Sequence, residues 1–123
     1  MNNSKAQHHR HLPAFILLQL AYESLHGGAI YNALINNVPD FQCDTAAIYR
    51  TLGQLEKDGA VSYSWDTSKA GPARKIYSIT PVGYEQLDFW KSDIELRIKK
   101  LKFFLYSYET LCESNIIEDK KNE

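Results

Sequence analysis

The sequence predicts a mostly α-helical fold that contains one small β-hairpin and ends in a long helix. Three observations support this prediction: an amphipathic helical segment over 44–59, an alternating strand pair over 61–79, and apolar residues at steps of three or four over 87–112. A helix with a partly polar exposed face, followed by a hairpin with a basic tip, is the layout of a winged helix-turn-helix. The sequence therefore predicts such a domain, joined to a long C-terminal dimerisation helix.

The length and composition limit the domain organisation. The chain has 123 residues, 44% of them hydrophobic, which suits one compact domain with an extension and excludes a large multidomain enzyme. We expect a flexible N-terminal arm over 1–11, the winged domain over 12–80, the dimerisation helix over 81–113 and a flexible tail over 114–123. No apolar run approaches the ~20 residues of a bilayer span, and the N-terminus lacks the apolar core of a signal peptide. We therefore expect a cytoplasmic, nucleoid-associated protein with no membrane partner.

The net charge of −1 argues at first sight against a polyanionic partner, because phosphate neutralisation supplies much of the affinity for DNA. The distribution of charge weakens this objection. Residues 1–80 carry seven basic and six acidic groups, whereas 81–123 carry seven and nine. Since Lys69, Arg74 and Lys75 lie on the hairpin, a local basic edge is compatible with a nearly neutral protein.

Two helices are expected before the amphipathic segment. The first covers about 13–24, where a proline suited to a first helical turn precedes an apolar run. Its apolar residues cover nearly every face, so we expect a dimer interface to absorb the excess and include Phe15 and Leu18 in it. A break at 25–28 separates this helix from the second, which is expected to end near Asn37.

The third helix is expected to begin at Asp44, whose carboxylate can accept hydrogen bonds from backbone amides of the first turn. It ends at Gly59. Its buried stripe is expected to contain Ala47 or Ile48, Leu52, Leu55 and the aliphatic stem of Glu56. The residues nearer the opposite side are Thr45, Ala46, Tyr49, Arg50 and Gly53.

The opposite side of this helix has side chains suited to contact with DNA. Arg50 can donate hydrogen bonds to guanine edges or phosphate, and the hydroxyl group of Tyr49 can reach a phosphate. The small residues Ala46 and Gly53 permit a close approach to the groove, and Thr45 lies on the same side. The alternative interpretation is an ordinary solvent-exposed helix face.

Beyond the third helix the pattern changes to the period of two that is typical of strands. The alternating residues of the first strand are Val61, Tyr63 and Trp65, and the returning strand holds Ile76, Tyr77 and Ile79. A tip that carries Lys69 and is flanked by Arg74 and Lys75 can straddle a DNA backbone or enter a minor groove. The alternative is a hairpin that only supports the packing of the helices.

Three segments are distinctive in combination. They are LHGGAI at 25–30, IYRTLGQLEKDGAV at 48–61 and GPARKIYSITPVGYEQL at 71–87, the last with its Gly-Pro, basic pair, Tyr and Thr-Pro-x-Gly. Across roughly 12–90 the chain resembles the PadR-type transcriptional regulators. Its length and single C-terminal helix are similar to the short subfamily, and WDTSKAGPARKIYSIT also resembles the polyhydroxybutyrate-responsive repressors within it.

The resemblance implies a dimeric repressor of the winged helix-turn-helix class. In such a protein the third helix enters the major groove of double-stranded DNA, the hairpin contacts the flanking backbone and the C-terminal helix pairs two subunits. Many relatives carry a Ser-Pro-Gly-Thr run at the start of the recognition helix, whereas this chain has Asp44, Thr45, Ala46 and Ala47. The missing hydroxyl at Ala47 and the carboxylate at Asp44 leave the operator sequence open, so the mode of binding transfers better than the specificity.

The last helix is predicted to begin at Thr80 and Pro81, which suit a cap and a first helical position. Apolar residues at steps of three or four then form a seam, namely Leu87, Trp90, Ile94, Ile98, Leu101, Leu105, Tyr108 and Cys112. A helix this long on so small a domain cannot bury that seam alone. We expect it to pack against the first helix of a second copy, in a symmetric homodimer whose recognition helices lie about one DNA turn apart. The expected interface residues are Phe15, Leu18, Trp90, Ile94, Ile98, Leu101, Leu105 and Tyr108.

The same helix holds more aromatic residues than a packing seam requires. Aromatic surface at a dimer junction can take up a flat apolar ligand. Relatives of the short subfamily sense small molecules at such a junction, and the resemblance implies the same here. We place a pocket for a hydrophobic aromatic effector at Phe89, Trp90 and Ile94, with packed core as the alternative interpretation.

No catalytic or metal-binding constellation is recognisable. There is no G-x-S-x-G motif, no Gly-rich phosphate loop and no metal-spaced His/Glu set, so we expect no enzyme, no cofactor and no metal. His8, His9 and His11 lie in a polar arm, and Cys43 and Cys112 are expected to be reduced thiols. The competing functional class is a winged-helix module that binds a protein or a granule surface, which the nearly neutral charge favours.

Overall fold

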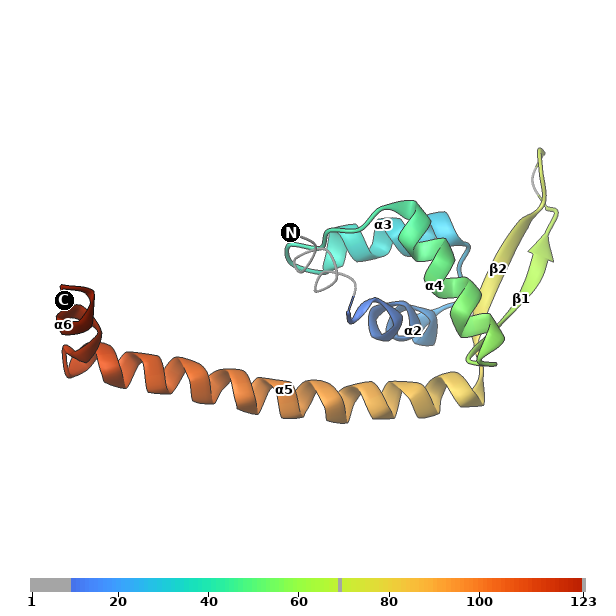
Figure 1. The fold of residues 1–123 in the computed structure, drawn as a ribbon. Helices are drawn as coiled ribbons and strands as arrows, with labels where there is room; N and C mark the ends of the chain where they lie inside the picture. The colour runs from blue at the N-terminus through green and yellow to red at the C-terminus, as the bar shows by residue number, and fades with distance from the viewer. Residues whose placement is uncertain (1–9, 69, 123) are drawn as a thin grey trace. The chain divides into compact units, whose positions relative to one another are not determined.

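A computed structural model describes residues 10–68 and 70–122 of the chain. In chain order its elements are α2 (Leu12–Tyr22), α3 (Gly27–Asn37), α4 (Thr45–Lys57), β1 (Val61–Asp66), β2 (Arg74–Ile79), α5 (Pro81–Glu113) and α6 (Ile116–Lys121), as Figure 1 shows. The two strands form an antiparallel hairpin. This composition confirms the predicted fold class. The chain divides into two compact units, Met1–Asp88 and Phe89–Glu123, so the division falls within α5.

The core of the first unit lies where α2, α3 and α4 pack against one another and against the hairpin (Figure 1). Its buried residues are Leu12, Ile16, Leu17, Leu20, Ile30, Leu34, Ala47, Ile48, Leu52, Leu55, Ala60, Val61 and Tyr77. The three helices contribute their apolar faces, and the hairpin contributes Val61, the first residue of β1, and Tyr77, the fourth residue of β2. Burial of these side chains provides the main free energy that holds the unit together.

The segment between α2 and α3 differs from the predicted break. α2 ends at Tyr22, two residues before the predicted end, because the following residues become extended. Leu25 then pairs with Tyr77 of β2: the Leu25 amide donates to the Tyr77 carbonyl at 3.1 Å, and the Tyr77 amide donates back at 2.9 Å. The hydroxyl oxygens of Ser24 and Ser78 are 2.6 Å apart. These bonds attach the hairpin to the helices.

The third helix agrees with the prediction at its start and along its buried side. The carboxylate Oδ1 of Asp44 accepts from the backbone amide of Ala47 at 2.8 Å, as a helix cap does. The buried residues of α4 are Ala47, Ile48, Leu52 and Leu55. After Lys57 the chain leaves the helix through Gly59, whose φ of +77° is a conformation that favours glycine.

The first turn of α5 is bonded to the turn between α4 and β1. The hydroxyl group of Thr80 donates to the Gly59 carbonyl at 2.5 Å and accepts from the Gly83 amide at 3.2 Å. The Thr80 amide also donates to the Ala60 carbonyl at 3.0 Å. Gly83 is buried against that same carbonyl oxygen, which leaves no room for a side chain. The predicted start of the last helix at Thr80 and Pro81 is therefore confirmed.

The second unit contains the remainder of α5 and α6. Large apolar side chains of this part of α5 are exposed, for example Leu101 at 64% and Leu105 at 58%. The segment over 114–123, which was predicted to be a flexible tail, contains the short helix α6 at 116–121. Acidic side chains in its first turn and lysines in its last turn complement the helix dipole, which favours the helix. None of the helices in the described residues combines the length and apolar character that a bilayer span requires.

Candidate nucleic-acid interface

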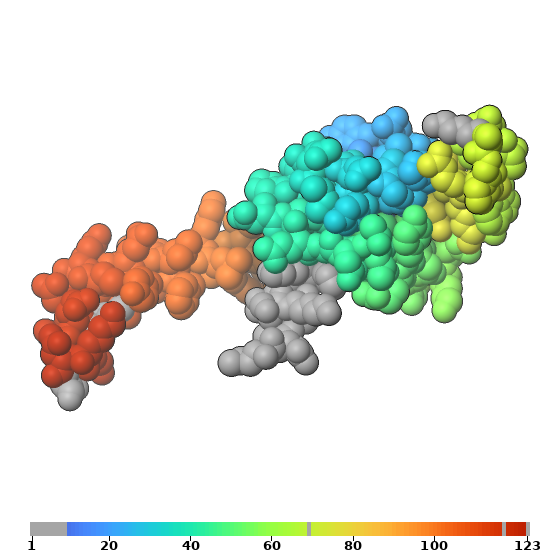
Figure 2. Space-filling view, turned by 90° about the horizontal axis from the view of Figure 1, so that it is seen from above, coloured from blue at the N-terminus to red at the C-terminus, as the bar shows by residue number. Residues whose placement is uncertain are grey.

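The predicted contact residues of α4 share one exposed face. Thr45, Ala46, Tyr49, Arg50 and Gly53 are all exposed, whereas the apolar residues on the other side of the helix are buried. The side chain of Tyr49 is 52% exposed. α3 and α4 lie side by side at the surface, next to the hairpin (Figure 2). The first unit thus has a continuous surface made by α3, α4 and the hairpin.

A hollow of about 330 Å³ lies in this surface, where the start of α3, the outer face of α4 and strand β2 meet. It is lined by His26, Gly27, Tyr49, Arg74, Lys75 and Tyr77. The structure therefore brings together three of the predicted contact residues, Tyr49 from α4 and Arg74 and Lys75 from β2. Thr45, Ala46 and Arg50 lie on the exposed face of α4 but do not line the hollow.

His26 is a member of this cluster that the sequence did not reveal. Its Nδ1 atom accepts from the backbone amide of Ala29 at 3.3 Å and so caps the start of α3. Its Nε2 atom lies 3.3 Å from Nη1 of Arg74. Two sequence signals involve His26: it belongs to the distinctive LHGGAI segment, and it directly precedes a helical segment. Neither signal indicates a contact residue, and histidine is not a favoured cap residue.

The lysine of the predicted basic edge is partly engaged within the fold. The ammonium group of Lys75 lies 3.8 Å from a carboxylate oxygen of Glu56 on α4 and 4.1 Å from the ring centroid of Tyr63. The side chain of Lys75 is 34% exposed, whereas the residue Arg74 is exposed. Arg74 is therefore the more accessible cation of this pair. Lys69, the third predicted cation of the hairpin, lies outside the described residues.

Tyr77 lines the hollow and is itself 6% exposed. Burial raises the pKa of its phenol, and the negative charge of Glu56 raises it further. The phenol of Tyr77 is therefore neutral at physiological pH. On the same strand pair, the rings of Tyr63 and Trp65 pack edge to face with their centroids 5.7 Å apart, and Trp65 is 58% exposed. This part of the hairpin consequently has an aromatic surface beside its cations.

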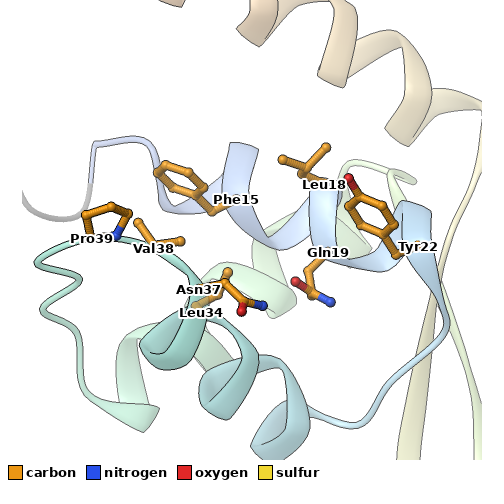
Figure 3. A pocket seen from close by; sticks show the side chains of 8 residues that line it. All are labelled: Phe15, Leu18, Gln19, Tyr22, Leu34, Asn37, Val38 and Pro39. Atoms are coloured by element: carbon orange, nitrogen blue, oxygen red, sulfur yellow. The ribbon is translucent and has the colours of Figure 1, made fainter.

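The predicted interface residues of the first unit line an apolar groove. This groove of about 530 Å³ is formed by side chains of α2, of the end of α3 and of the two residues after it, namely Phe15, Leu18, Gln19, Tyr22, Leu34, Asn37, Val38 and Pro39. Figure 3 shows how these side chains surround the groove. The groove is open to solvent, and Leu18 is 47% exposed.

The predicted interface and effector residues of the second unit lie along α5. Ile98, Leu101, Leu105 and Tyr108 are exposed, while Trp90 and Ile94 are half-buried. Phe89 is 64% exposed. Its ring packs edge to face on that of Trp90, with the two centroids 5.8 Å apart. The dimer interface and the effector pocket stay predictions.

Within residues 10–68 and 70–122, no group of three or more His, Cys, Asp or Glu side chains has an arrangement that could hold a metal ion. His8 and His9 lie outside the described residues. Cys43 and Cys112 are free cysteines.

Similar solved structures share the fold. A protein described as a conserved protein of unknown function and potential transcriptional factor is 30% identical, with a TM-score of 0.72, over 83% of this chain and 90% of its own. A PadR-like transcriptional regulator from Bacillus cereus is 26% identical, with a TM-score of 0.65, over 77% of this chain and 91% of its own. Bacillus subtilis PadR in complex with operator DNA is 24% identical, with a TM-score of 0.59, over 64% of this chain and 46% of its own.

The sequence itself matches a family. A comparison with curated proteins gave no match. The model of the transcriptional regulator PadR-like family, by contrast, matches residues 16–88, which are more than half of the chain. Because this is a family of transcriptional regulators, the match also confirms that the chain is not an enzyme. The exposed α4 face, the hairpin beside it and this match lead to one conclusion: the chain belongs to the PadR-like family of transcriptional regulators.

Proposed function

We propose that this protein is a homodimeric repressor that binds a specific sequence of double-stranded DNA and responds to a small molecule. The observation that carries the proposal is the division of α4 into a buried apolar face and an exposed face with Thr45, Ala46, Tyr49 and Arg50. An α-helix with such a face fits the major groove. The relative from Bacillus subtilis was solved in complex with operator DNA, which supports the same use of the fold here.

The proposed contacts divide into base recognition and backbone positioning. Arg50 would donate to a guanine edge, and the small side chain of Ala46 would allow the helix to approach the bases closely. Tyr49 would donate to a phosphate, and Arg74 would contact the backbone that flanks the groove. Lys75 would contribute less, because Glu56 already neutralises part of its charge.

The proposed dimer covers the exposed apolar surfaces of both units. In one chain the seam of α5 exposes Ile98 by 45%, Leu101 by 64% and Leu105 by 58%. Contiguous exposed apolar surface of this kind is typical of protein interfaces. The groove that contains Phe15 and Leu18 is a second apolar surface, and it lies in the first unit. We propose that a second copy covers both surfaces.

The proposed effector is a flat, hydrophobic aromatic molecule held near Phe89, Trp90 and Ile94. Exposed aromatic rings can stack on such a ligand in the dimer. A ligand that binds one arrangement of the dimer more tightly than another would shift the spacing of the recognition helices. In a Trp65→Phe variant, fluorescence reports on Trp90 alone, so a panel of planar compounds can be titrated directly. No change with any compound would contradict the pocket.

The test of DNA binding is a fluorescence-anisotropy titration with the duplex upstream of the protein's own gene and a scrambled duplex, at two salt concentrations. We expect tight, salt-sensitive binding with a clear preference for the first duplex. The variant Arg50→Ala should lose this preference. Lys91→Ala, which removes an exposed charge that pairs with Glu95, is the matched control and should bind normally. Equal weak binding of both duplexes would contradict autoregulation and favour another operator or a protein partner.

A further inference from the structure

We propose that the hollow between α3, α4 and β2 seats one phosphate group of the DNA backbone. In this assignment His26, Arg74 and Tyr49 donate hydrogen bonds to its oxygen atoms. The inference rests on the proposed function, because it specifies where the protein holds the backbone of a duplex that it binds. It adds His26, which was not among the predicted contact residues, to the residues that contact DNA.

Both ring nitrogens of His26 lie within hydrogen-bond distance of a neighbouring group. Its Nδ1 accepts the amide hydrogen of Ala29 at 3.3 Å, and in the neutral tautomer that makes this bond the ring proton is on Nε2. Nε2 lies 3.3 Å from Nη1 of Arg74, which can only donate. In this tautomer two donors face each other at the wall of the hollow. An anionic oxygen placed beside them can accept from both, and such charge-assisted hydrogen bonds are among the stronger ones.

The other walls of the hollow add a donor and positive charge. The hydroxyl group of Tyr49 lies over Gly27, which has no side chain to displace it, and it supplies a further donor at the rim. Lys75 adds positive charge. None of the described residues that line the hollow is acidic. The hollow therefore has the charge and the donors that a phosphate requires.

Two carboxylates lie near these cations, and both have partners of their own. Glu56 pairs with Lys75 at 3.8 Å. Asp66, which is opposite Arg74 in the strand register, accepts from the amide of Ser68 at 3.0 Å and from its hydroxyl group at 2.6 Å. The guanidinium of Arg74 is consequently the main positive charge that the hollow offers to a ligand.

The location of the hollow favours a phosphate of DNA over a free anion. Tyr49 belongs both to the hollow and to the exposed face of α4 that we assign to the major groove. A helix in that groove has backbone phosphates along both sides, and contacts to them fix its register on the duplex. A phosphate seat beside α4 would therefore hold the recognition helix in position.

The test uses a duplex that the full-length protein selects from a random-sequence library, so that no operator needs to be known. Single phosphates of this duplex are replaced in turn by neutral methylphosphonates, and the affinity of each is measured by anisotropy. We expect one position in each half-site where the replacement weakens binding by about tenfold. This is the effect expected when one charge-assisted hydrogen bond is lost. In the variants His26→Asn and Arg74→Gln the same replacement should cost less than about twofold.

The two variants are chosen to keep the fold. Asparagine is a favoured cap residue and can still accept the Ala29 amide, so His26→Asn removes the Nε2 donor and leaves the start of α3 intact. Circular dichroism and thermal unfolding check this directly. Lys91→Ala is the control for nonspecific loss of charge and should show the full tenfold effect at the same phosphate.

Each outcome decides the question. Suppose that every methylphosphonate that costs about tenfold with the wild type also costs about tenfold with both variants, while the variants still prefer the duplex. The proposed phosphate site is then wrong, and the proposed function stands. If the library yields no preferred duplex, the proposed function fails and the seat fails with it. Binding of inorganic phosphate, detected by NMR signals of the His26 ring, without coupling at any duplex position would assign the hollow to a free anion and overturn the proposal.

Discussion

The aromatic ring of Tyr49 lies directly over Gly27. A methyl group at position 27 would come within 2.8 Å of the Tyr49 hydroxyl oxygen and would overlap the ring. Because Gly27 at the start of α3 has no side chain, the ring of Tyr49 on α4 can lie over it. A glycine of α3 thus allows the position of Tyr49, which is a proposed DNA contact on α4.

The variant Gly27→Ala should bind its duplex about fivefold more weakly, because the methyl group pushes the Tyr49 ring away from the hollow. The ring is at the end of a rotatable side chain, so the free energy of unfolding should change little. Anisotropy and urea unfolding measure the two effects. In the Gly27→Ala background, Tyr49→Phe should have no further effect on affinity. If the two losses of free energy simply add, the ring and Gly27 are not coupled.

The variant Gly53→Ala should stabilise the fold but not improve binding. A side chain at this exposed position of α4 meets no other atom, and alanine favours a helix interior over glycine by about 1 kcal/mol. We expect a corresponding rise in the free energy of unfolding. Duplex affinity should fall, because the methyl group faces the groove. An increase in affinity would indicate that this side of α4 does not approach DNA.

The variant Gly83→Ala should destabilise the protein by about 2 kcal/mol, as over-packing of a buried position does. The new methyl group would collide with the Ala60 carbonyl oxygen, which is backbone and cannot rotate away. Val82→Ala, at the adjacent exposed position, is the control and should change the stability by less than about 0.5 kcal/mol. Equal midpoints of urea unfolding for the two variants would contradict the close packing of α5 on this turn.

The variant Leu105→Lys should weaken the dimer at least about thirtyfold, since it places a charge in the proposed seam at a cost of roughly 2 kcal/mol. Sedimentation equilibrium measures this, and weaker duplex binding should accompany it. Leu96→Lys makes the same substitution nine residues earlier, on the opposite face of the ideal helix, and should leave the dimer intact. A wild-type protein that is monomeric at tens of micromolar would refute the dimer itself.

The variant Asp44→Asn should make the thiol of Cys43 more reactive at a given pH. Burial raises the pKa of this thiol, and the adjacent Asp44 carboxylate raises it further. Removing the negative charge lowers the pKa, so the alkylation rate should rise at lower pH than in the wild type. Iodoacetamide kinetics in a Cys112→Ser background isolate this thiol. Asparagine still caps α4, so an unshifted profile would mean that Asp44 does not act on Cys43.

Features with local causes could be predicted from the sequence. Asp44 and Thr80 cap helices through amides three residues later, so a short stretch of sequence contains both partners. The buried stripe of α4 follows from spacing alone. The predicted contact residues on this helix are indeed exposed on one side, although their contact with DNA stays a prediction.

Features with distant partners could not be predicted in the same way. His26 and Arg74 are 48 positions apart, and nothing in the periodicity of either segment indicates that they meet. The pairing of Lys75 with Glu56, which reduces the charge of the basic edge, likewise depends on how the hairpin packs on α4. The helix over 116–121 was missed because short polar segments have little pattern, and only the placement of their charges favours a helix.

The pairing of Leu25 with Tyr77 has a consequence for how the domain unfolds. These two residues are joined by reciprocal backbone hydrogen bonds, and Tyr77 is 6% exposed within the helical core. The amide hydrogens of this pair can therefore exchange with solvent only when the helices and the hairpin separate together. We expect both amides to show the slow hydrogen exchange of global unfolding, and the amides near Ser68 to exchange through local opening. We therefore expect the base of the hairpin to keep its position on the helices when the protein binds a partner.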